Sequence, residues 1–162
     1  METRKNKKIL IALDYDPTAK KVAELGYSFA KSMDADVILL HIVSDPVYYS
    51  TTAYSPILGL TDPIEMEPQL LPGVDGLKNA AQIFLDKIKQ HLGDEHIQTL
   101  LKDGDFAETI LKTAKSLHAD VIVMGSHSHK WLENIVMGSV TQEVLRNTSL
   151  PLFIIPTKKS DK

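Results

Sequence analysis

The chain has 162 residues, of which 43% are hydrophobic and 24% are charged, and its net charge is −3. That size suits one domain with one core, and that charge offers no basic surface for nucleic acid or an anionic membrane. No apolar run approaches the roughly 18 residues that cross a bilayer, and the absence of cysteine excludes disulfides, thiolate metal sites and thiol nucleophiles. We therefore expect a cytoplasmic protein that binds neither nucleic acid nor membrane.

Short apolar runs alternate with amphipathic segments from the start of the chain. Lys8–Leu13 is short and apolar, as in a buried strand. Asp16 and Pro17 then indicate the start of a helix, whose apolar positions recur at helical spacing: Val22, Leu25, Phe29 and Met33. Residues 37–43 are apolar almost throughout, which is typical of a parallel strand covered on both faces.

The segment 44–73 interrupts this alternation. It holds five of the eight prolines (Pro46, Pro56, Pro63, Pro68 and Pro72) together with Tyr48, Tyr49 and Tyr54. A stretch of this length without periodicity is a binding loop, a lid or a plain connector. The sequence leaves these alternatives open, and we treat the segment as an insertion within one domain.

The second half of the chain returns to alternation. A helix is predicted from Gly76 to Leu92 with Gly93 as its stop, and Asp105 and Glu108 begin another. The remaining strands are short apolar runs, predicted at Ile97–Leu101, Val121–Met124 and Leu152–Ile155, with a last helix over Val140–Asn147. The expected fold is α/β: a single-domain, open, five-stranded parallel sheet with helices on both faces, Rossmann-like.

Residues 121–140 combine a strand, a polar loop and a helix start. Gly125 ends the apolar run, and the pair Gly138 and Ser139 precedes the helix, where Ser139 with Gln142 fits a capping box. Unpaired N–H groups at a helix start attract phosphate. In open parallel sheets, ligands lie beyond the carboxyl ends of the strands, so Asp14 and Gly125 are expected to face one crevice. Taken alone, the spacing fits either phosphate binding or ordinary turn and cap chemistry.

Four segments in order resemble the universal stress protein family. The glycine frame of that family falls on Gly125, Ser128, Gly138 and Ser139, with serine in place of the second glycine. The other segments are KILIALD (8–14), VILLHIV (37–43) and GDFAETIL (104–111). The resemblance implies an adenine nucleotide alpha hydrolase-like fold over a domain of residues 5–157 that contains the 44–73 insertion.

The resemblance to the ATP-binding subgroup of this family implies ATP as cofactor, with or without Mg²⁺. Phosphates would bind the loop after Gly125 and the turn at Gly138, and Asp14 and Ile42 would hold the ribose and base; Asp14 as a simple turn cap is the other interpretation. The implied binding residues are Ala12, Leu13, Asp14, Ile42, Met124, Gly125, Ser128, Gly138, Ser139 and Val140. No catalytic base–nucleophile pair or metal site is evident, so at most slow ATP hydrolysis is expected.

The resemblance also implies a dimeric stress-response regulator with an unidentified protein partner. The homodimer would form through the last strand: Leu152, Phe153, Ile154 and Ile155. Because Ser128 departs from the glycine pattern, a dimeric interaction module that binds no nucleotide is the alternative. A nucleotidyl-transfer enzyme is a weaker one, since DYDPTA (14–19) offers no H-x-G-H motif.

The histidines have ordinary interpretations. His41, inside a strand, is expected to be a hydrogen-bonded core residue. His127 and His129 are too few for a closed zinc site, which takes about four ligands.

Overall fold

The computed structural model describes residues 6–44, 73–126 and 137–157. Within them, strands and helices alternate as predicted: β1 (Lys8–Leu13), α1 (Ala19–Ser32), β2 (Asp36–Val43), α3 (Gly73–Leu92), β3 (Gln98–Asp103), α4 (Phe106–Ser116), β4 (Val121–Gly125), α5 (Ser139–Asn147) and β5 (Leu152–Ile155). The predicted α/β fold with five parallel strands is confirmed.

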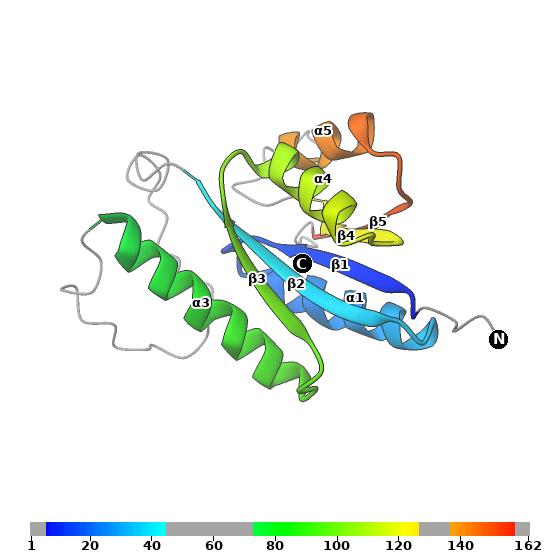
Figure 1. Cartoon of the computed structure of the whole chain (residues 1–162), viewed down its shortest axis with the longest axis horizontal. Helices are drawn as coiled ribbons and strands as arrows, with labels where there is room; N and C mark the ends of the chain where they lie inside the picture. Colours follow the sequence, from blue (N-terminus) through cyan, green and yellow to red (C-terminus); the bar gives the residue numbers. More distant parts are fainter. Residues whose placement is uncertain (1–5, 45–72, 127–136, 158–162) are drawn as a thin grey trace, which may run out of the picture.

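The strands form one parallel sheet in the order β3-β2-β1-β4-β5. The chain winds outward from β1 to β3, crosses back to β4 beside β1, and continues to β5 at the opposite edge (Figure 1). The direction of winding therefore reverses between β1 and β4. A crevice for ligands is expected at this point, beyond the carboxyl ends of these two strands.

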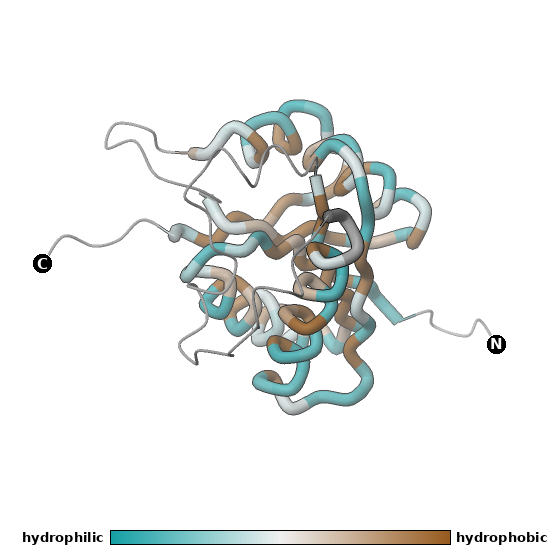
Figure 2. The backbone as a smooth tube through the Cα atoms, turned by 90° about the vertical axis from the view of Figure 1, so that its left-hand side faces the viewer, coloured by the Kyte–Doolittle hydropathy of each residue, from teal (hydrophilic) through white to brown (hydrophobic). Residues whose placement is uncertain are grey.

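Helices cover both faces of the sheet. α1 and α3 lie together on one face, and α4 and α5 lie together on the other (Figure 1). Alternate strand residues enter the two layers: Ile9 and Ile11 contact the α1 and α3 side, and Leu10 contacts the α4 and α5 side. Hydrophobic segments gather between the helices while hydrophilic ones lie outside (Figure 2). Burial on both faces explains why β1, β2 and β4 are apolar without alternation.

Gly26 lets α1 lie close to the sheet. A Cβ atom at this position would lie 2.9 Å from Ile11 Cδ1 and 3.1 Å from Val123 Cγ1. Both of these side chains are fully buried. The glycine therefore sets the distance between α1 and the two central strands β1 and β4.

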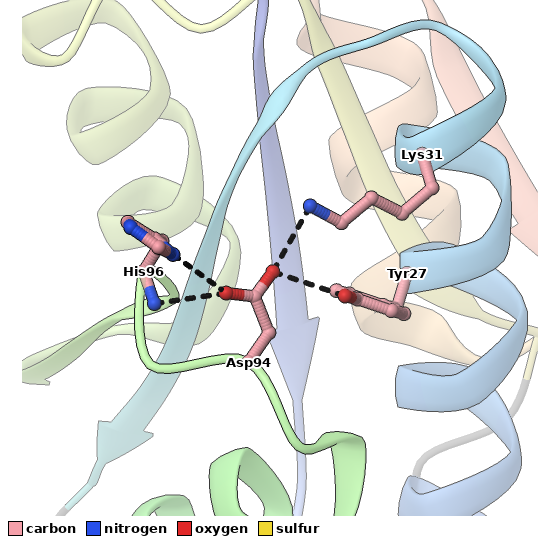
Figure 3. Close-up of polar contacts among 4 residues, drawn as sticks. All are labelled: Tyr27, Lys31, Asp94 and His96. Atoms are coloured by element: carbon pink, nitrogen blue, oxygen red, sulfur yellow. Dashed lines mark hydrogen bonds and ion pairs between the residues drawn. The ribbon is translucent and has the colours of Figure 1, made fainter.

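A cluster of polar contacts links the turn before β3 to α1 (Figure 3). The Asp94 carboxylate accepts hydrogen bonds from Tyr27 Oη at 3.0 Å and from the backbone N–H of His96 at 2.9 Å. It also pairs with Lys31 Nζ at 3.0 Å. The bond from Lys31, followed by those from His96 and Tyr27, holds the pKa of Asp94 well below its usual value. The cluster joins α1 to the α3–β3 turn at the end of the sheet remote from Asp14.

The predicted helix ends are only partly right. Gly93 stops α3 with φ of +71°, and Asp105 caps α4 by accepting from the Glu108 N–H at 3.1 Å. α1, in contrast, has Thr18 at its N-cap, and Leu25 is 45% exposed although its spacing predicts an apolar face. In the ranges that the structure describes, no helix has the length and apolar character to cross a bilayer.

Candidate functional site

A crevice lies where the winding of the sheet reverses. The residues around it come from the carboxyl ends of β1, β2 and β4 and from the first turns of three helices. They are Ala12, Leu13, Asp14, Asp16, Thr18, Ala19, Val22, Leu40, Ile42, Phe106, Ile110, Met124, Gly125, Val140 and Thr141. The fold thus brings these strand ends, helix starts and the connections between them to one place.

One side of the crevice is apolar. Ile42 and Met124, from β2 and β4, are buried. Phe106 and Ile110 extend this surface from the start of α4. An apolar wall with a few polar groups at its margin is the usual lining of a small-molecule site.

Two carboxylates lie on the connection from β1 to α1. Asp14 lines the crevice, and its Oδ1 accepts the N–H of the adjacent Tyr15 at 2.8 Å. Asp16 Oδ1 accepts from the Thr18 N–H at 2.7 Å and from Thr18 Oγ1 at 2.6 Å. This half of the crevice is therefore acidic, with both side chains partly buried.

The opposite half is formed by the end of β4 and the start of α5. Gly125 is the last residue of β4 and pairs with Ile155, so the turn predicted at Gly125 begins one residue later. Its carbonyl accepts a hydrogen bond from Thr141 Oγ1 at 2.9 Å. The Gly138 N–H donates to the Ser126 carbonyl at 2.6 Å, which joins the residue after β4 to the residue before α5. α5 therefore begins directly beside β4.

The predicted capping box at Ser139 is wrong. Gly138 occupies the N-cap position with φ −66° and ψ 158°, and no side chain caps the helix. Ser139 is instead the first residue of α5 and is exposed. Gln142 donates through Nε2 to the Met137 carbonyl at 2.9 Å rather than to the cap. The N–H groups of this first turn are consequently not covered by a capping side chain.

His41 is a hydrogen-bonded core histidine, as its place in a strand predicts. It is 1% exposed, and its Nδ1 lies 2.8 Å from the Leu13 carbonyl. Because a carbonyl only accepts, Nδ1 carries the proton. The ring lies against Tyr15 and Phe84, with centroid distances of 4.3 and 5.6 Å. Burial lowers the pKa of His41, so the ring is neutral at pH 7.

Seven of the ten residues predicted from the sequence line this crevice: Ala12, Leu13, Asp14, Ile42, Met124, Gly125 and Val140. Gly138 and Ser139 lie just before Val140, at the start of α5, and do not line it. Ser128 lies outside the described residues, as do His127 and His129.

The sequence patterns miss several residues of the crevice. They use Asp16 only to indicate the start of a helix, and they give Phe106 and Ile110 no role at a site. Thr141 carries no signal except its place in the first turn of the predicted last helix. The expected parallel sheet does offer one clue, because it places the start of every following helix at the same edge. Among the described residues, no group of three or more histidine and carboxylate side chains is arranged to hold a metal ion.

Comparison with known proteins places the chain in a family. A profile of the Universal stress protein family matches residues 5–156. Universal stress protein MJ0531 of Methanocaldococcus jannaschii is 30% identical over 158 residues, covering 96% of this chain and 85% of the relative. Universal stress protein MJ0577 of the same organism is 28% identical, covering 95% and 97%.

Solved structures agree with the fold. The structure of MJ0577 superposes with a TM-score of 0.71 at 28% identity, covering 95% of this chain and 98% of that one. Universal stress protein UspA from Lactobacillus plantarum gives a TM-score of 0.64 at 20% identity, covering 94% and 99%. With the family profile matching nearly the whole chain and the sheet order in place, the protein belongs to the universal stress protein family.

Proposed function

We propose that this universal stress protein binds an adenine nucleotide, ATP best, in the crevice at the carboxyl ends of β1, β2 and β4. It acts as a dimeric regulator with little or no turnover. The observation that carries the proposal is the convergence, in one crevice, of seven of the binding residues that the family resemblance implies. The proposed site adds Gly138 and Ser139 at the start of α5, and Ser128 from the sequence frame.

The apolar wall suits a flat heterocycle. Ile42, Met124 and Phe106 come from three different elements and present carbon surface to the same space. Burial of such surface contributes on the order of 25 cal/mol per Å² removed from water. A base seated there would leave its ribose near the connection from β1 to α1.

Charge sets the orientation of the ligand. Asp14 and Asp16 repel phosphate and accept hydrogen bonds from hydroxyl groups, so they suit the ribose. The start of α5 carries N–H groups without a side-chain cap and the positive end of a helix dipole, so it suits phosphate. The phosphates are therefore assigned to the side formed by Gly125, Gly138 and Ser139. Any Mg²⁺ would accompany the nucleotide.

A structural neighbour supports the class of ligand. A universal stress protein solved in complex with cAMP has a TM-score of 0.59 to this chain at 14% identity. At that identity the likeness shows the fold alone, so the choice of adenine rests on the resemblance of this chain to the ATP-binding subgroup of its family, and the binding experiment tests it. Among adenine nucleotides we expect ATP to bind best, because the start of α5 has no side-chain cap and can bind an extended phosphate chain.

The proposed dimer forms through the outer edge of β5. In the described residues β5 pairs with β4 on one side and ends the sheet on the other. Phe153, 37% exposed, stacks on Phe29 of α1 at 4.4 Å between centroids. An apolar edge strand needs cover, and a second copy of the same strand supplies it with a two-fold interface.

Nucleotide binding is tested by mass spectrometry of compounds released from purified protein, followed by titration with ATP and GTP. Ser139→Ala is expected to weaken ATP binding roughly tenfold, because a hydrogen bond to a charged group contributes about 1.5–3 kcal/mol. Ser149→Ala, at an exposed serine just before β5, is the matched control. Absence of binding in the wild type would favour the interaction module without nucleotide.

Assembly is tested by light scattering at micromolar concentration. Phe153→Lys is expected to give monomers, since a charge on the edge strand opposes pairing. Leu145→Lys changes an apolar residue of α5 that is 49% exposed and should leave the dimer unchanged. A wild-type monomer would remove the dimer from the proposal, and so would a Phe153→Lys dimer.

A further inference from the structure

Ser126, the residue after Gly125, is buried and hydrogen-bonded to the segment that follows β5. Its N–H donates to the Ile155 carbonyl at 2.8 Å. Its Oγ accepts the Thr157 N–H at 2.9 Å and lies 3.3 Å from Thr157 Oγ1. Ser126 and Thr157 are each 7% exposed. These contacts continue the β4–β5 pairing past the last residue of either strand.

The same serine also reaches the start of α5. Its carbonyl accepts the Gly138 N–H at 2.6 Å. One residue earlier, the Gly125 carbonyl accepts from Thr141 Oγ1 at 2.9 Å, and Thr141 is 2% exposed. The end of β4 is therefore held between α5 on one side and the segment after β5 on the other, although neither Ser126 nor Thr157 lines the crevice.

We infer that Ser126 and Thr157 are positioning residues for the nucleotide site, so that the segment after β5 controls nucleotide affinity without contacting the nucleotide. The inference rests on the proposed function, in which phosphate binds beside Gly125 and Gly138. Donor groups bind an anion well only when they are held in place before it arrives. If the Ser126–Thr157 contact is lost, the N–H groups at the start of α5 lose their fixed position relative to β4.

The contact differs from ordinary core packing because it is polar and buried. Thr157→Val removes only the contact between the two hydroxyls and keeps the bond from the backbone N–H of residue 157, whereas Ser126→Ala removes both contacts. Lys21 Nζ donates to the carbonyl of the neighbouring Pro156 at 2.9 Å from an exposed position. It offers a control in the same segment.

The test compares ATP affinity among folded variants by calorimetry. Thr157→Val is expected to weaken binding roughly three- to tenfold, the range that one buried hydrogen bond supports. Thr157→Ser, which keeps the hydroxyl, should remain within about twofold of the wild type. Lys21→Ala should bind as the wild type does. The double variant, Ser126→Ala with Thr157→Val, should bind ATP only slightly more weakly than Ser126→Ala alone, because the two substitutions act on the same contact.

Amide hydrogen exchange without nucleotide separates this inference from the proposed function. Thr157→Val should speed exchange of the Gly138 N–H, which donates to Ser126, and spare the amides of α1. Wild-type affinity in Thr157→Val would overturn the inference, as would equal losses in Thr157→Val and Thr157→Ser, or unchanged Gly138 exchange. A wild type that does not bind ATP overturns the proposed function, and Gly138 exchange then decides whether the contact positions α5.

Discussion

Replacing Gly26 tests how closely α1 lies against the sheet. In Gly26→Ala, the new Cβ meets Ile11 Cδ1 at 2.9 Å and Val123 Cγ1 at 3.1 Å, and both of these side chains are fully buried. Overpacking of this kind costs about 1–3 kcal/mol, while alanine in place of glycine in a helix returns about 1 kcal/mol. The expected net loss for alanine is about 1 kcal/mol.

Gly26→Val adds two further methyl groups at the same point and regains less helix propensity. We expect a net loss of about 2–3 kcal/mol, which lowers Tm by roughly 5–10 °C in a domain of this size. Urea unfolding with a common m-value measures the free energy, and calorimetry measures Tm. Ser28→Ala, at an exposed position two residues along α1, should be slightly stabilising. Wild-type stability in Gly26→Val would refute the close contact of α1 with β1 and β4.

Three further predictions concern pH and the glycine frame. Burial lowers the pKa of His41 below its usual 6.5, so near that pH the unfolded chain binds a proton that the folded chain does not. Stability therefore falls as pH drops below about 6.5. The fall in Tm from pH 8 to 5.5 should be smaller in His41→Leu than in the wild type. The pKa of Asp94 lies below its usual 3.8, so the stability that its carboxylate contributes is present above about pH 4 and fades below it. The difference in urea midpoint between the wild type and Asp94→Ala should therefore shrink from pH 7 to pH 3. A constant difference would contradict this. On the sequence frame, Ser128→Gly should weaken ATP binding by about 1 kcal/mol, whereas several-fold tighter binding would show that the serine obstructs the site.

The strands can be predicted from the sequence because burial on both faces leaves apolar runs that need no alternation. The predicted ranges Lys8–Leu13 and Leu152–Ile155 match β1 and β5 to the residue. Local chemistry also identifies helix ends where one residue decides the conformation, as at Gly93 with φ of +71°. These features depend on neighbours in sequence, which is why sequence patterns predict them.

Features that depend on partners distant in sequence escape such patterns. The spacing that includes Leu25 predicts an apolar helix face. The position of the sheet decides which residues of α1 contact it, and Gly26 lies against the sheet while Leu25 is exposed. The capping box at Ser139 fails because Gly138 bonds to Ser126, the residue after β4, and takes the N-cap position. The crevice combines Asp16 on one side with Thr141 on the opposite side for the same reason, because parallel pairing of β1 and β4 brings the segments after these strands together.

Calorimetric titration of the purified protein with ATP and Mg²⁺ tests the central claim most directly. We expect saturable binding with one nucleotide per chain, tighter for ATP than for GTP and weakened by Ser139→Ala. Absence of heat at millimolar ATP, with a protein shown to be folded and stripped of bound nucleotide, would contradict it. The crevice would then belong to an interaction module that binds no nucleotide.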